Sequence, residues 1–300
     1  MYVPAHRDLD RSTPTMQRTA VEASRDADQA VATLKGQTVV IKYGGALMDQ
    51  PTLKNLFARD VAFMRSAGVN PVVVHGGGPL ITRLMERSGK AVRFVDGMRI
   101  TDDETMPLVE TALRQVNREI VDLIERQGAS AGGFGGWESS LVRARRRRHV
   151  LPSGETVDLG RVGDVESVNP KPIRMLQERG IVPVIAALGI GADALTYDIN
   201  ADLVAGEMAA ILGAAFLIFL TDVPGVSTRD GCRYRQLSRW GADSLVWDGE
   251  ISGGMLPKVE GAVRALKGGA GRAQIIDGRV PHAILRTLHA RHGVGTEIVP

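Results

Sequence analysis

The stretch PVVVHGGG, residues 71–78, joins an apolar β-branched run directly to a turn of three glycines. Such a run without polar alternation is typical of a strand buried on both faces, as strands of parallel sheets are. Apolar residues at helical spacing follow the turn through Leu84. Because strand, glycine turn and helix come in this order, the stretch predicts one unit of an α/β fold around a mainly parallel sheet.

The same order recurs along the chain. Further buried strands are predicted at 38–42, 181–187, 215–220 and 273–276. Helices are predicted at 53–64, 109–124, 201–212 and 259–266, and a closing helix includes Leu285 and Leu288. Polar or glycine-rich turns follow the strands at 42–45, 75–78, 188–191, 221–225 and 277–278. In a parallel sheet these turns share the carboxyl edge, where ligands of open α/β sheets bind, so we expect their motifs to converge.

The middle of the chain predicts a different structure. Two β-like runs, 141–150 and 156–162, flank turn residues 152–154, which predicts a β-hairpin. The hairpin carries Arg143 and four consecutive arginines at 145–148. A nucleic-acid patch is one interpretation, but the run lacks aromatic partners for base stacking, and charges on an exposed hairpin are usually solvated. We therefore expect no nucleic-acid partner.

A dinucleotide-like pattern, G-x-G-x-x-A, occurs at residues 189–194. No helix is predicted directly after it, because residues 195–197 look β-like, and the first strand of the chain lacks the pattern. A hairpin turn is the favoured interpretation.

The N-terminal residues 1–35 are interpreted as an extension. Residues 1–15 are predicted to be disordered, and small apolar residues at helical spacing predict a helix over 16–34. Two interpretations stay open for this helix: it packs on its own domain, or it mediates oligomerisation.

Composition limits the class of protein. A chain of 300 residues can form one large domain or two lobes, and a net charge of +3 is too small to imply a polyanionic partner. The single Cys232 excludes an internal disulfide and fits a reducing compartment. No apolar run reaches the roughly 18 residues of a membrane span. We expect a cytoplasmic protein with no membrane partner.

Two lysines and one aspartate are the strongest catalytic candidates. Lys42 ends an apolar strand before two glycines, and Lys258 ends the glycine-containing stretch SGGMLPK. Lysines neutralise charge on a transferred phosphoryl group, and glycine turns let amides approach phosphate oxygens. Asp202 would hold both ammonium groups. The alternatives are that the lysines are solvated surface residues and that Asp202 complements a helix dipole.

Other sequence features refine this hypothesis. The Walker A pattern is absent, so a phosphate enzyme here would be of another type. Arg99, just before a predicted helix, can bind a carboxylate through two of its guanidinium nitrogens, although taken alone an exposed arginine near a helix start is unremarkable. Thr101 or Asp102 is expected to cap that helix.

An ordered set of motifs then carries a resemblance to a known family. The motifs are V-I-K-Y-G-G, V-V-H-G-G-G-P, F-V-D-G-M-R-I-T, V-D-L-G-x-V-G-x-V, Y-x-I-N-A-D, L-T-D-V-P-G-V, S-G-G-M-x-P-K and D-G-R-V-P-H. Each is weak alone, but the ordered set is specific. Over about residues 36–300 the chain resembles the N-acetylglutamate kinases of the amino acid kinase family.

This resemblance implies a three-layer αβα sandwich with two lobes, residues 36–195 for the acceptor substrate and 196–300 for the nucleotide. It implies transfer of the ATP γ-phosphoryl group to the side-chain carboxylate of N-acetyl-L-glutamate, in arginine biosynthesis. ATP would enter with Mg²⁺ as its substrate complex, with little direct protein ligation of the metal.

The resemblance also assigns roles to residues. Lys42 and Lys258 would stabilise the transition state, and Asp202 would orient them. The implied substrate-binding residues are Gly76, Gly77, Gly78, Arg99, Asp198 and Asn200. The implied nucleotide-binding residues are Gly44, Gly45, Thr221, Asp222, Val223, Pro224, Gly225, Val226, Glu250, Ile251 and Ser252.

Three departures from the family pattern bear on substrate and regulation. Asp198 replaces the usual asparagine and would face the acceptor's α-carboxylate; two such charges about 4 Å apart cost roughly 1–4 kcal/mol. The stretch 132–138 lacks a lysine and an aspartate that many members carry. The N-terminal helix is Ala-rich, and Arg291-His292 stand where arginine-inhibited members have acids, so we predict weak or absent inhibition by L-arginine.

Several hypotheses about assembly and activity stay open. A homodimer is expected, and a hexamer is a further possibility. The chain could be a kinase of the same fold acting on a different carboxylate or phosphate acceptor, as Asp198 suggests. It could also be a non-catalytic nucleotide-binding regulatory relative, although retention of both lysines and Asp202 argues against that.

Overall fold

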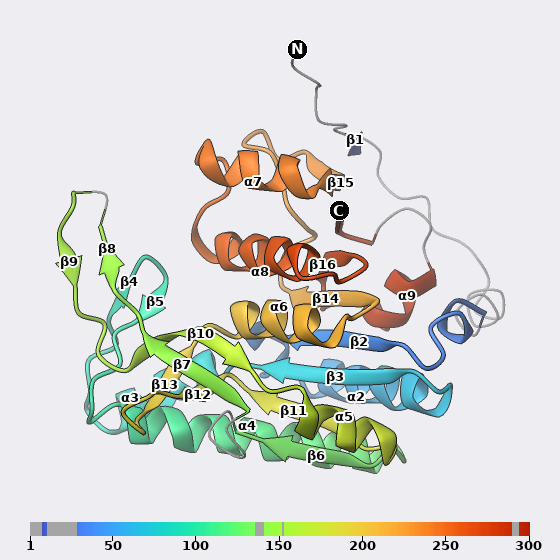
Figure 1. Ribbon diagram of the computed structural model, residues 1–300, viewed down its shortest axis with the longest axis horizontal. Coiled ribbons are helices and arrows are strands. Elements are labelled where there is room, and N and C mark those ends of the chain that lie inside the picture. Colours follow the sequence, from blue (N-terminus) through green and yellow to red (C-terminus); the bar gives the residue numbers. More distant parts are fainter. Residues whose placement is uncertain (1–7, 11–28, 136–140, 152, 290–293) are drawn as a thin grey trace.

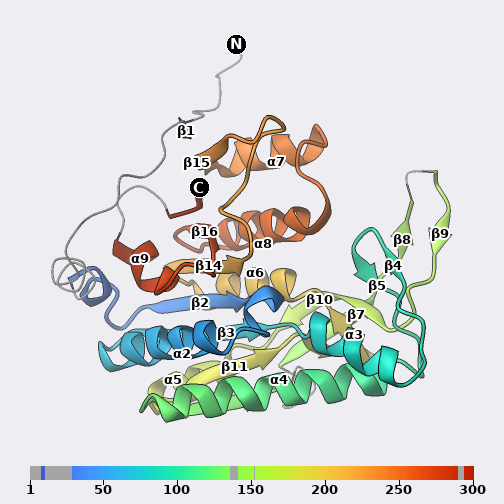
Figure 2. The same ribbon diagram turned by 180° about the vertical axis from the view of Figure 1, so that it is seen from behind.

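The computed structural model describes residues 8–10, 29–135, 141–151, 153–289 and 294–300. Within them a nine-stranded sheet has the order β1-β15-β17-β16-β14-β2-β3-β11-β6, with helices on both faces (Figures 1 and 2). The strands, in this order, are Asp8–Asp10, Arg233–Ser238, Thr296–Val299, Ala273–Asp277, Phe216–Thr221, Thr38–Tyr43, Asn70–His75, Val182–Ala186 and Ala131–Phe134. Pairing is parallel from β16 through β6, which confirms the predicted mainly parallel α/β fold.

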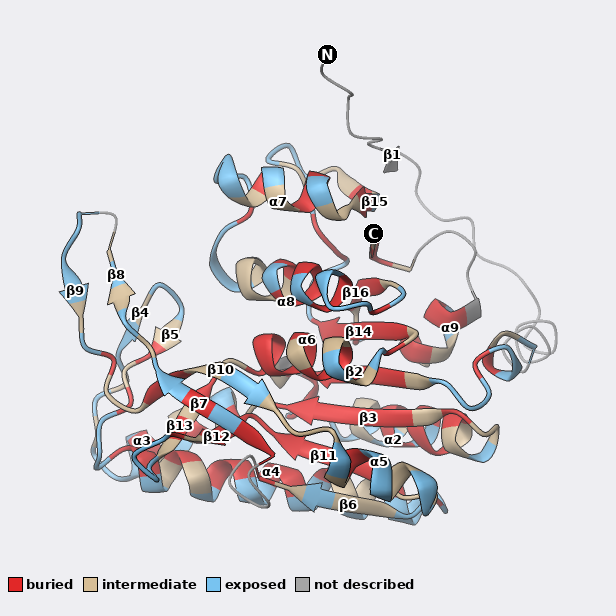
Figure 3. Ribbon diagram, viewed as in Figure 1, coloured by how far each residue is buried: buried red, intermediate tan, exposed pale blue. Residues whose placement is uncertain are grey.

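Strand β2 shows why the central strands are apolar throughout. Val39 and Ile41 belong to the core cluster on one face of the sheet, and Val40 belongs to the cluster on the other face. All three are fully buried. A strand covered on both faces has no polar side, so its sequence does not alternate. The central strands are accordingly buried along most of their length (Figure 3).

Helices complete the two outer layers of the sandwich. One face carries α2 (Pro51–Ser66), α4 (Met106–Arg126) and α9 (Ala283–His289), and the other carries α5 (Lys171–Glu178), α6 (Ala201–Leu212) and α8 (Leu256–Lys267). Two more helices pack at the ends, α3 (Gly78–Arg87) against α4 and α7 (Arg239–Trp247) against α8. Proline stands in the first turn of α2, α3, α4, α5 and α8, where its missing N–H costs no helical hydrogen bond. No helix in the described ranges is long and apolar enough to cross a membrane.

A small closed barrel lies beside the sheet (Figure 1). Its strands are β7 (Val142–Arg146), β10 (Val162–Val168), β12 (Leu188–Ile190) and β13 (Thr196–Ile199). Two hairpins extend from this end of the molecule, β4–β5 (Phe94–Val95 and Met98–Arg99) and β8–β9 (His149–Val150 and Thr156–Val157). The predicted hairpin around residues 152–154 is confirmed, and so is the hairpin interpretation of 189–194, because β12 and β13 pair antiparallel.

Part of the arginine run is neutralised within its own hairpin. Arg146 lies 2.9 Å from Asp158, and Arg147 lies 2.7 Å from Asp164. Arg143, Arg145, Arg146 and Arg148 are exposed. The charges therefore sit on a solvated, self-paired face of the barrel.

Several elements differ from the sequence-based expectations. Within the stretch predicted to be disordered, Asp8–Asp10 pair with the edge strand β15, whose open backbone groups accept another strand. Helix α4 begins at Met106, and Asp102 accepts a hydrogen bond from the Thr105 N–H ahead of it. Elements β6, α5, β15, α7 and β17 were not predicted, because they are short or only partly apolar. Most of the predicted N-terminal helix, the segment 136–140 and residues 291–292 lie outside the described residues.

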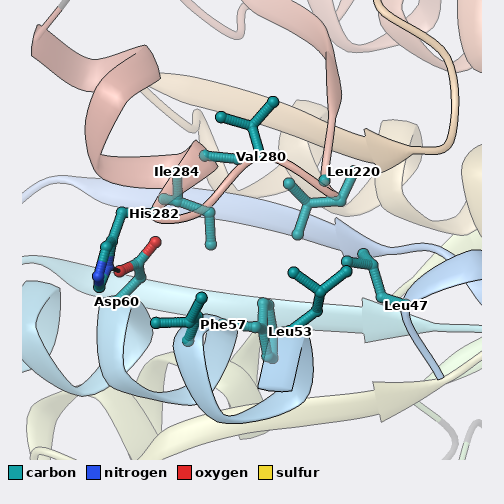
Figure 4. A pocket seen from close by; sticks show the side chains of 11 residues that line it. Leu47, Leu53, Phe57, Asp60, Leu220, Val280, His282 and Ile284 are labelled. Atoms are coloured by element: carbon teal, nitrogen blue, oxygen red, sulfur yellow. Dashed lines mark hydrogen bonds and ion pairs between the residues drawn. The ribbon is translucent and has the colours of Figure 1, made fainter. Parts of the chain in front are cut away.

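A small apolar pocket between α2 and the β16–α9 connection is lined by Asp60 and His282, whose side chains contact each other (Figure 4). Asp60, only 2% exposed, lies 2.6 Å from His282 Nδ1, and its carboxylate also accepts a hydrogen bond from the Leu285 N–H near the start of α9. Burial raises the pKa of Asp60 to about 6, although both partners act to lower it. The pair joins α2 to α9 away from the lysine cluster.

The raised pKa of Asp60 predicts a pH-dependent stability. The folded state binds a proton on Asp60 more readily than the unfolded state does. The contribution of Asp60 to the free energy of unfolding therefore falls as pH rises from about 4 to 6 and is constant above pH 6. Relative to Asp60→Asn, the wild-type free energy of unfolding should fall by about 2 kcal/mol between pH 4.5 and 7.5. Urea unfolding followed by circular dichroism measures it, and a difference that stays constant over this range would contradict it.

Candidate active site

Three charged side chains from distant parts of the chain meet at the carboxyl edge of the sheet. Asp202 Oδ1 lies 2.9 Å from Lys42 Nζ, and Asp202 Oδ2 lies 3.2 Å from Lys258 Nζ. The Lys42, Asp202 and Lys258 side chains are only 11%, 6% and 13% exposed. Ion pairs this far from bulk water are weakly screened by salt. The structure thus brings together the three residues that the turn sequences singled out.

Local sequence fixes each of these positions. Lys42 lies near the end of β2, where the apolar run stops. Asn200 caps α6, with its Oδ1 accepting the Asp202 N–H at 2.8 Å, so Asp202 stands in the first helical turn. Lys258 is in the first turn of α8, where Nζ also donates to the Gly254 carbonyl at 2.9 Å. Asp202 therefore both complements the helix dipole and binds the lysines.

The two neighbouring lysines determine the ionisation of Asp202. Burial by itself raises the pKa of this carboxyl, but the charges and hydrogen bonds of Lys42 and Lys258 outweigh burial and hold the pKa below the ordinary aspartate range. The cluster therefore stays ionised at neutral pH, with two cations on one anion. A net positive cluster beside glycine turns suits a phosphoryl group in transit.

Helices α6 and α8 touch along a seam of small residues that places Lys258 on Asp202. A Cβ on Gly206 would lie 2.4 Å from the Gly261 carbonyl oxygen, and one on Gly261 would lie 2.5 Å from the Asp202 carbonyl oxygen. Just past the end of α8, a Cβ on Gly268 would lie 2.3 Å from Ala210 Cβ. The two backbones are therefore as close as they can pack, and their contact sets the register of the ion pair.

The glycine turns lie around this cluster. A Cβ on Gly44 would lie 2.2 Å from the Leu220 carbonyl oxygen, so only glycine fits where the turn after β2 meets the end of β14. Gly45 lies against Pro79, which follows Gly78 at the start of α3. Gly76 lies against Ala201, next to Asp202. Turns that follow three different strands thus meet at one place.

A buried polar pair behind the 76–78 turn was missed by sequence reasoning. His75 is fully buried; its Nδ1 lies 2.9 Å from the Gly76 carbonyl oxygen, and its Nε2 lies 2.9 Å from Asn117 Nδ2. Burial lowers the His75 pKa to about 4, so the ring is neutral, donates from Nδ1 and accepts at Nε2. Asn117 also donates to the Val184 carbonyl at 2.9 Å. The pair ties α4 and β11 to the carbonyl of the first turn glycine.

Arg99 lies at the Gly78 end of the 76–78 turn, whereas Gly76 lies against Ala201, beside the lysine cluster. Its guanidinium donates to the Gly78 carbonyl at 3.2 Å, to Thr82 Oγ1 at 2.9 Å and to Met85 Sδ at 3.3 Å. It also stacks over the Phe94 ring, 4.7 Å from its centroid. Burial lowers the pKa of Arg99, and the nearby charge of Asp198 opposes that shift. These hydrogen-bond partners are neutral, so the cation is positioned without forming an ion pair.

Asp198, on β13, faces the same region. Its carboxyl accepts a hydrogen bond from the Thr101 side chain, and burial raises its pKa to about 6, opposed by the charge of Arg99 and by that hydrogen bond. Asn200 follows two residues later, at the start of α6, where its Oδ1 is engaged in capping. The residues expected to bind the acceptor therefore lie together between the barrel and α3.

The two stretches expected to bind nucleotide are less closely joined. In 221–226, Thr221 is buried at the end of β14, residues 222–224 are exposed, and the Val226 N–H donates to Thr296 Oγ1 at 2.9 Å. In 250–252, Ile251 is buried while Glu250 and Ser252 are exposed. Val226 and Ile251 share one core cluster. Among described residues, no hydrogen bond or ion pair joins the two stretches.

Within the part of the chain that the structure describes, no three His, Cys, Asp or Glu side chains form a group that could hold a metal ion. At the carboxyl edge the lysines, the arginine and the glycine amides are groups that bind anions.

Comparison with known proteins agrees with this geometry. The model of the amino acid kinase family matches residues 37–277. The acetylglutamate kinase of Alkalilimnicola ehrlichii is 45% identical over 295 residues, covering 96% of both chains. The acetylglutamate kinase of Nitrosospira multiformis is 47% identical over 265 residues, covering 88% of this chain and 90% of that protein.

Solved structures share the fold at lower identity. The N-acetylglutamate synthase of Neisseria gonorrhoeae, complexed with coenzyme A and N-acetyl-glutamate, superposes with a TM-score of 0.81 at 24% identity. The match covers 94% of this chain but 64% of that one, so this chain spans less than two thirds of the synthase. Carbamate kinase from Giardia lamblia bound to AMP-PNP gives a TM-score of 0.64 at 16% identity, over 88% of this chain and 98% of that one. At these identities the likeness extends to the fold alone.

Proposed function

This chain belongs to the amino acid kinase family, and we propose that it transfers the γ-phosphoryl group of ATP to the side-chain carboxylate of N-acetyl-L-glutamate, a step of arginine biosynthesis. The observation that carries the proposal is Asp202 holding Lys42 Nζ and Lys258 Nζ at 2.9 and 3.2 Å. Its second support is the identity of about 45% to acetylglutamate kinases over nearly the whole chain.

The proposed reaction needs charge stabilisation rather than a covalent intermediate. An oxygen of the acceptor carboxylate attacks the γ-phosphorus, the bond from that phosphorus to the β-phosphate oxygen breaks, and ADP leaves. The attacking carboxylate is already ionised, so no general base is required. Lys42 and Lys258 neutralise the oxygens of the moving group, and Asp202 keeps both lysines in place without a reorganisation cost.

The nucleotide enters in this proposal as its Mg²⁺ complex. Mg²⁺ would arrive with the nucleotide and neutralise part of its phosphate charge, while Lys42, Lys258 and the glycine amides would act on the phosphate oxygens. Gly44 and Gly45, in the turn that follows Lys42, would meet the phosphates. Residues 221–226 and 250–252 would line the remainder of the nucleotide site.

The acceptor would lie on the other side of the 76–78 turn. The amides of Gly76, Gly77 and Gly78 would bind its reacting end, and Arg99 would bind its α-carboxylate. Asp198 and Asn200 border this region. The lobe division at 195/196 belongs to the same proposal, with Asp202 of the nucleotide lobe joined to Lys42 of the acceptor lobe.

We further propose a cytoplasmic homo-oligomer. Its support is β6 at one end of the sheet, a partly exposed edge strand to which a second copy can add. Light scattering coupled to gel filtration tests the assembly, and a monomer at micromolar concentration would contradict it.

Acyl-phosphate formation tests the proposed function directly. The purified protein, with ATP and Mg²⁺, is offered N-acetyl-L-glutamate, N-acetyl-L-aspartate, L-glutamate and L-aspartate, and hydroxylamine traps any acyl phosphate. We expect hydroxamate and equimolar ADP with N-acetyl-L-glutamate, and neither with the Lys258→Met variant. Absence of product from all four acids, in a protein that binds ATP, would overturn the proposal.

A further inference from the structure

Two opposite charges face each other in the acceptor region without forming an ion pair. In β13, Tyr197 and Ile199 point into the core, so Asp198 between them points to the other face of the strand. There its carboxyl meets the Thr101 hydroxyl and the field of Arg99. Among the described residues no Arg99 nitrogen lies within 4.0 Å of an acidic oxygen, so the two groups act on each other through their charges without direct contact.

The groups around Asp198 leave Arg99 as the cation that acts on it. The Asp198 N–H donates to the Arg161 carbonyl at 2.8 Å, but the Arg161 guanidinium is taken up by Asp103 and by the Thr196 carbonyl. The strands paired with β13 bring Val162 and Leu188 beside Asp198, and neither is charged. With a pKa of about 6, the Asp198 carboxyl is mostly ionised at pH 8.

An arginine and an aspartate close together best fit a substrate group that carries both a negative and a positive charge. A free α-amino acid carries a carboxylate and an ammonium on one carbon, so it offers an anion to Arg99 and a cation to Asp198, both through charge-assisted hydrogen bonds. An N-acylated amino acid offers the same anion but only a neutral amide N–H. Its α-carboxylate then approaches Asp198 with no ammonium group to offset their repulsion, which weakens binding by about five-fold to a thousand-fold at a separation of about 4 Å.

We propose that Asp198 determines acceptor specificity, and that the site also phosphorylates the side-chain carboxylate of a dicarboxylic α-amino acid whose ammonium group is free. The inference rests on the proposed phosphoryl transfer. The chemistry is unchanged: a carboxylate oxygen bonds to the γ-phosphorus, the bond to the β-phosphate oxygen breaks, and the products are an acyl phosphate and ADP. Asp198 binds the ammonium and takes no part in the bond changes.

The test compares two acceptors on two proteins. For wild type and Asp198→Asn, kcat/KM is measured at pH 8 for L-glutamate and for N-acetyl-L-glutamate, from both hydroxamate and ADP. We expect Asp198→Asn to raise the value for N-acetyl-L-glutamate and lower it for L-glutamate, so that the glutamate-to-acetylglutamate ratio falls at least 30-fold. A merely structural role would lower both values together and leave the ratio unchanged.

Controls separate the possible outcomes. Asp193→Asn changes a carboxylate on the neighbouring β12–β13 turn, where it bonds Tyr197, and should leave the ratio within about two-fold. Asp198→Ser removes the charge with a smaller side chain and should lower the ratio as Asp198→Asn does. A ratio that changes less than three-fold in both variants, with N-acetyl-L-glutamate still phosphorylated, overturns this inference alone. No acyl phosphate from either acceptor with any of the proteins overturns the proposed function as well.

Discussion

Replacing Lys258 by methionine is expected to lower kcat about 1,000-fold, because the ammonium that meets the transferred phosphoryl group is lost while the chain that carries it keeps its length. The wild-type Nζ is held by Asp202 Oδ2 and the Gly254 carbonyl, so it needs no reorganisation as charge develops. Lys42→Met should lower kcat to a similar degree, since Asp202 holds the two lysines alike. The acceptor KM should change much less than kcat.

Lys267→Met is the matched control for this prediction. Lys267 lies at the other end of α8 and pairs with Asp243 at 2.9 Å, where its side chain is 52% exposed. Its loss should leave kcat within two-fold and stability within about 0.5 kcal/mol. Turnover is followed by ADP release with folding checked by circular dichroism, and a Lys258→Met enzyme retaining a tenth of wild-type kcat would refute the assignment.

The Asp202→Ala change is expected to damage both activity and folding. It leaves two nearly buried ammonium groups without an anion, which destabilises the protein by about 3–5 kcal/mol. It also frees both lysines to move, so kcat should fall by at least the factor seen for either lysine variant. The pKa of Asp202 is lowered in the folded state. Its contribution to the free energy of unfolding is therefore fully present above about pH 4 and is lost only as pH falls through that lowered pKa.

Urea unfolding at several pH values measures the Asp202 effect. The difference between wild type and Asp202→Ala should stay constant from pH 6 to 9. Asp243→Ala, which removes the exposed partner of Lys267, should cost less than 1 kcal/mol. If Asp202→Ala were as stable as Asp243→Ala, the buried lysines would have another counter-charge, and the role of Asp202 as their organiser would be wrong.

The parts of this site that could be predicted from sequence are those fixed by strand ends. Lys42 and the glycines at 76–78 follow long apolar runs, and parallel pairing forces the ends of such runs to one edge. The position of Asp202 follows from the start of α6, because Asn200 is an ordinary helix-capping residue. These local signals carry information about three-dimensional position because the sheet is parallel there.

The parts that could not be predicted depend on contacts distant in sequence. Asn117 reads as one polar residue in an amphipathic helix, and nothing local says that it meets His75 across 42 positions. The order of β15, β17 and β16 was equally hidden, because β17 runs antiparallel to β16 and parallel to β15. The acceptor region could be named from the family resemblance, but the approach of Asp198 to Arg99 required the fold.

The seam between α6 and α8 has an evolutionary consequence. In a protein core a smaller side chain at one position can be compensated by a larger side chain at a neighbouring position. Gly206 and Gly261 have no such freedom, because no residue is smaller and a Cβ on either would collide with backbone. Substitutions in this part of the chain can be compensated almost everywhere except at these two positions, which fix how Lys258 meets Asp202. A lineage that loses either glycine therefore loses the alignment of its catalytic charges in one step.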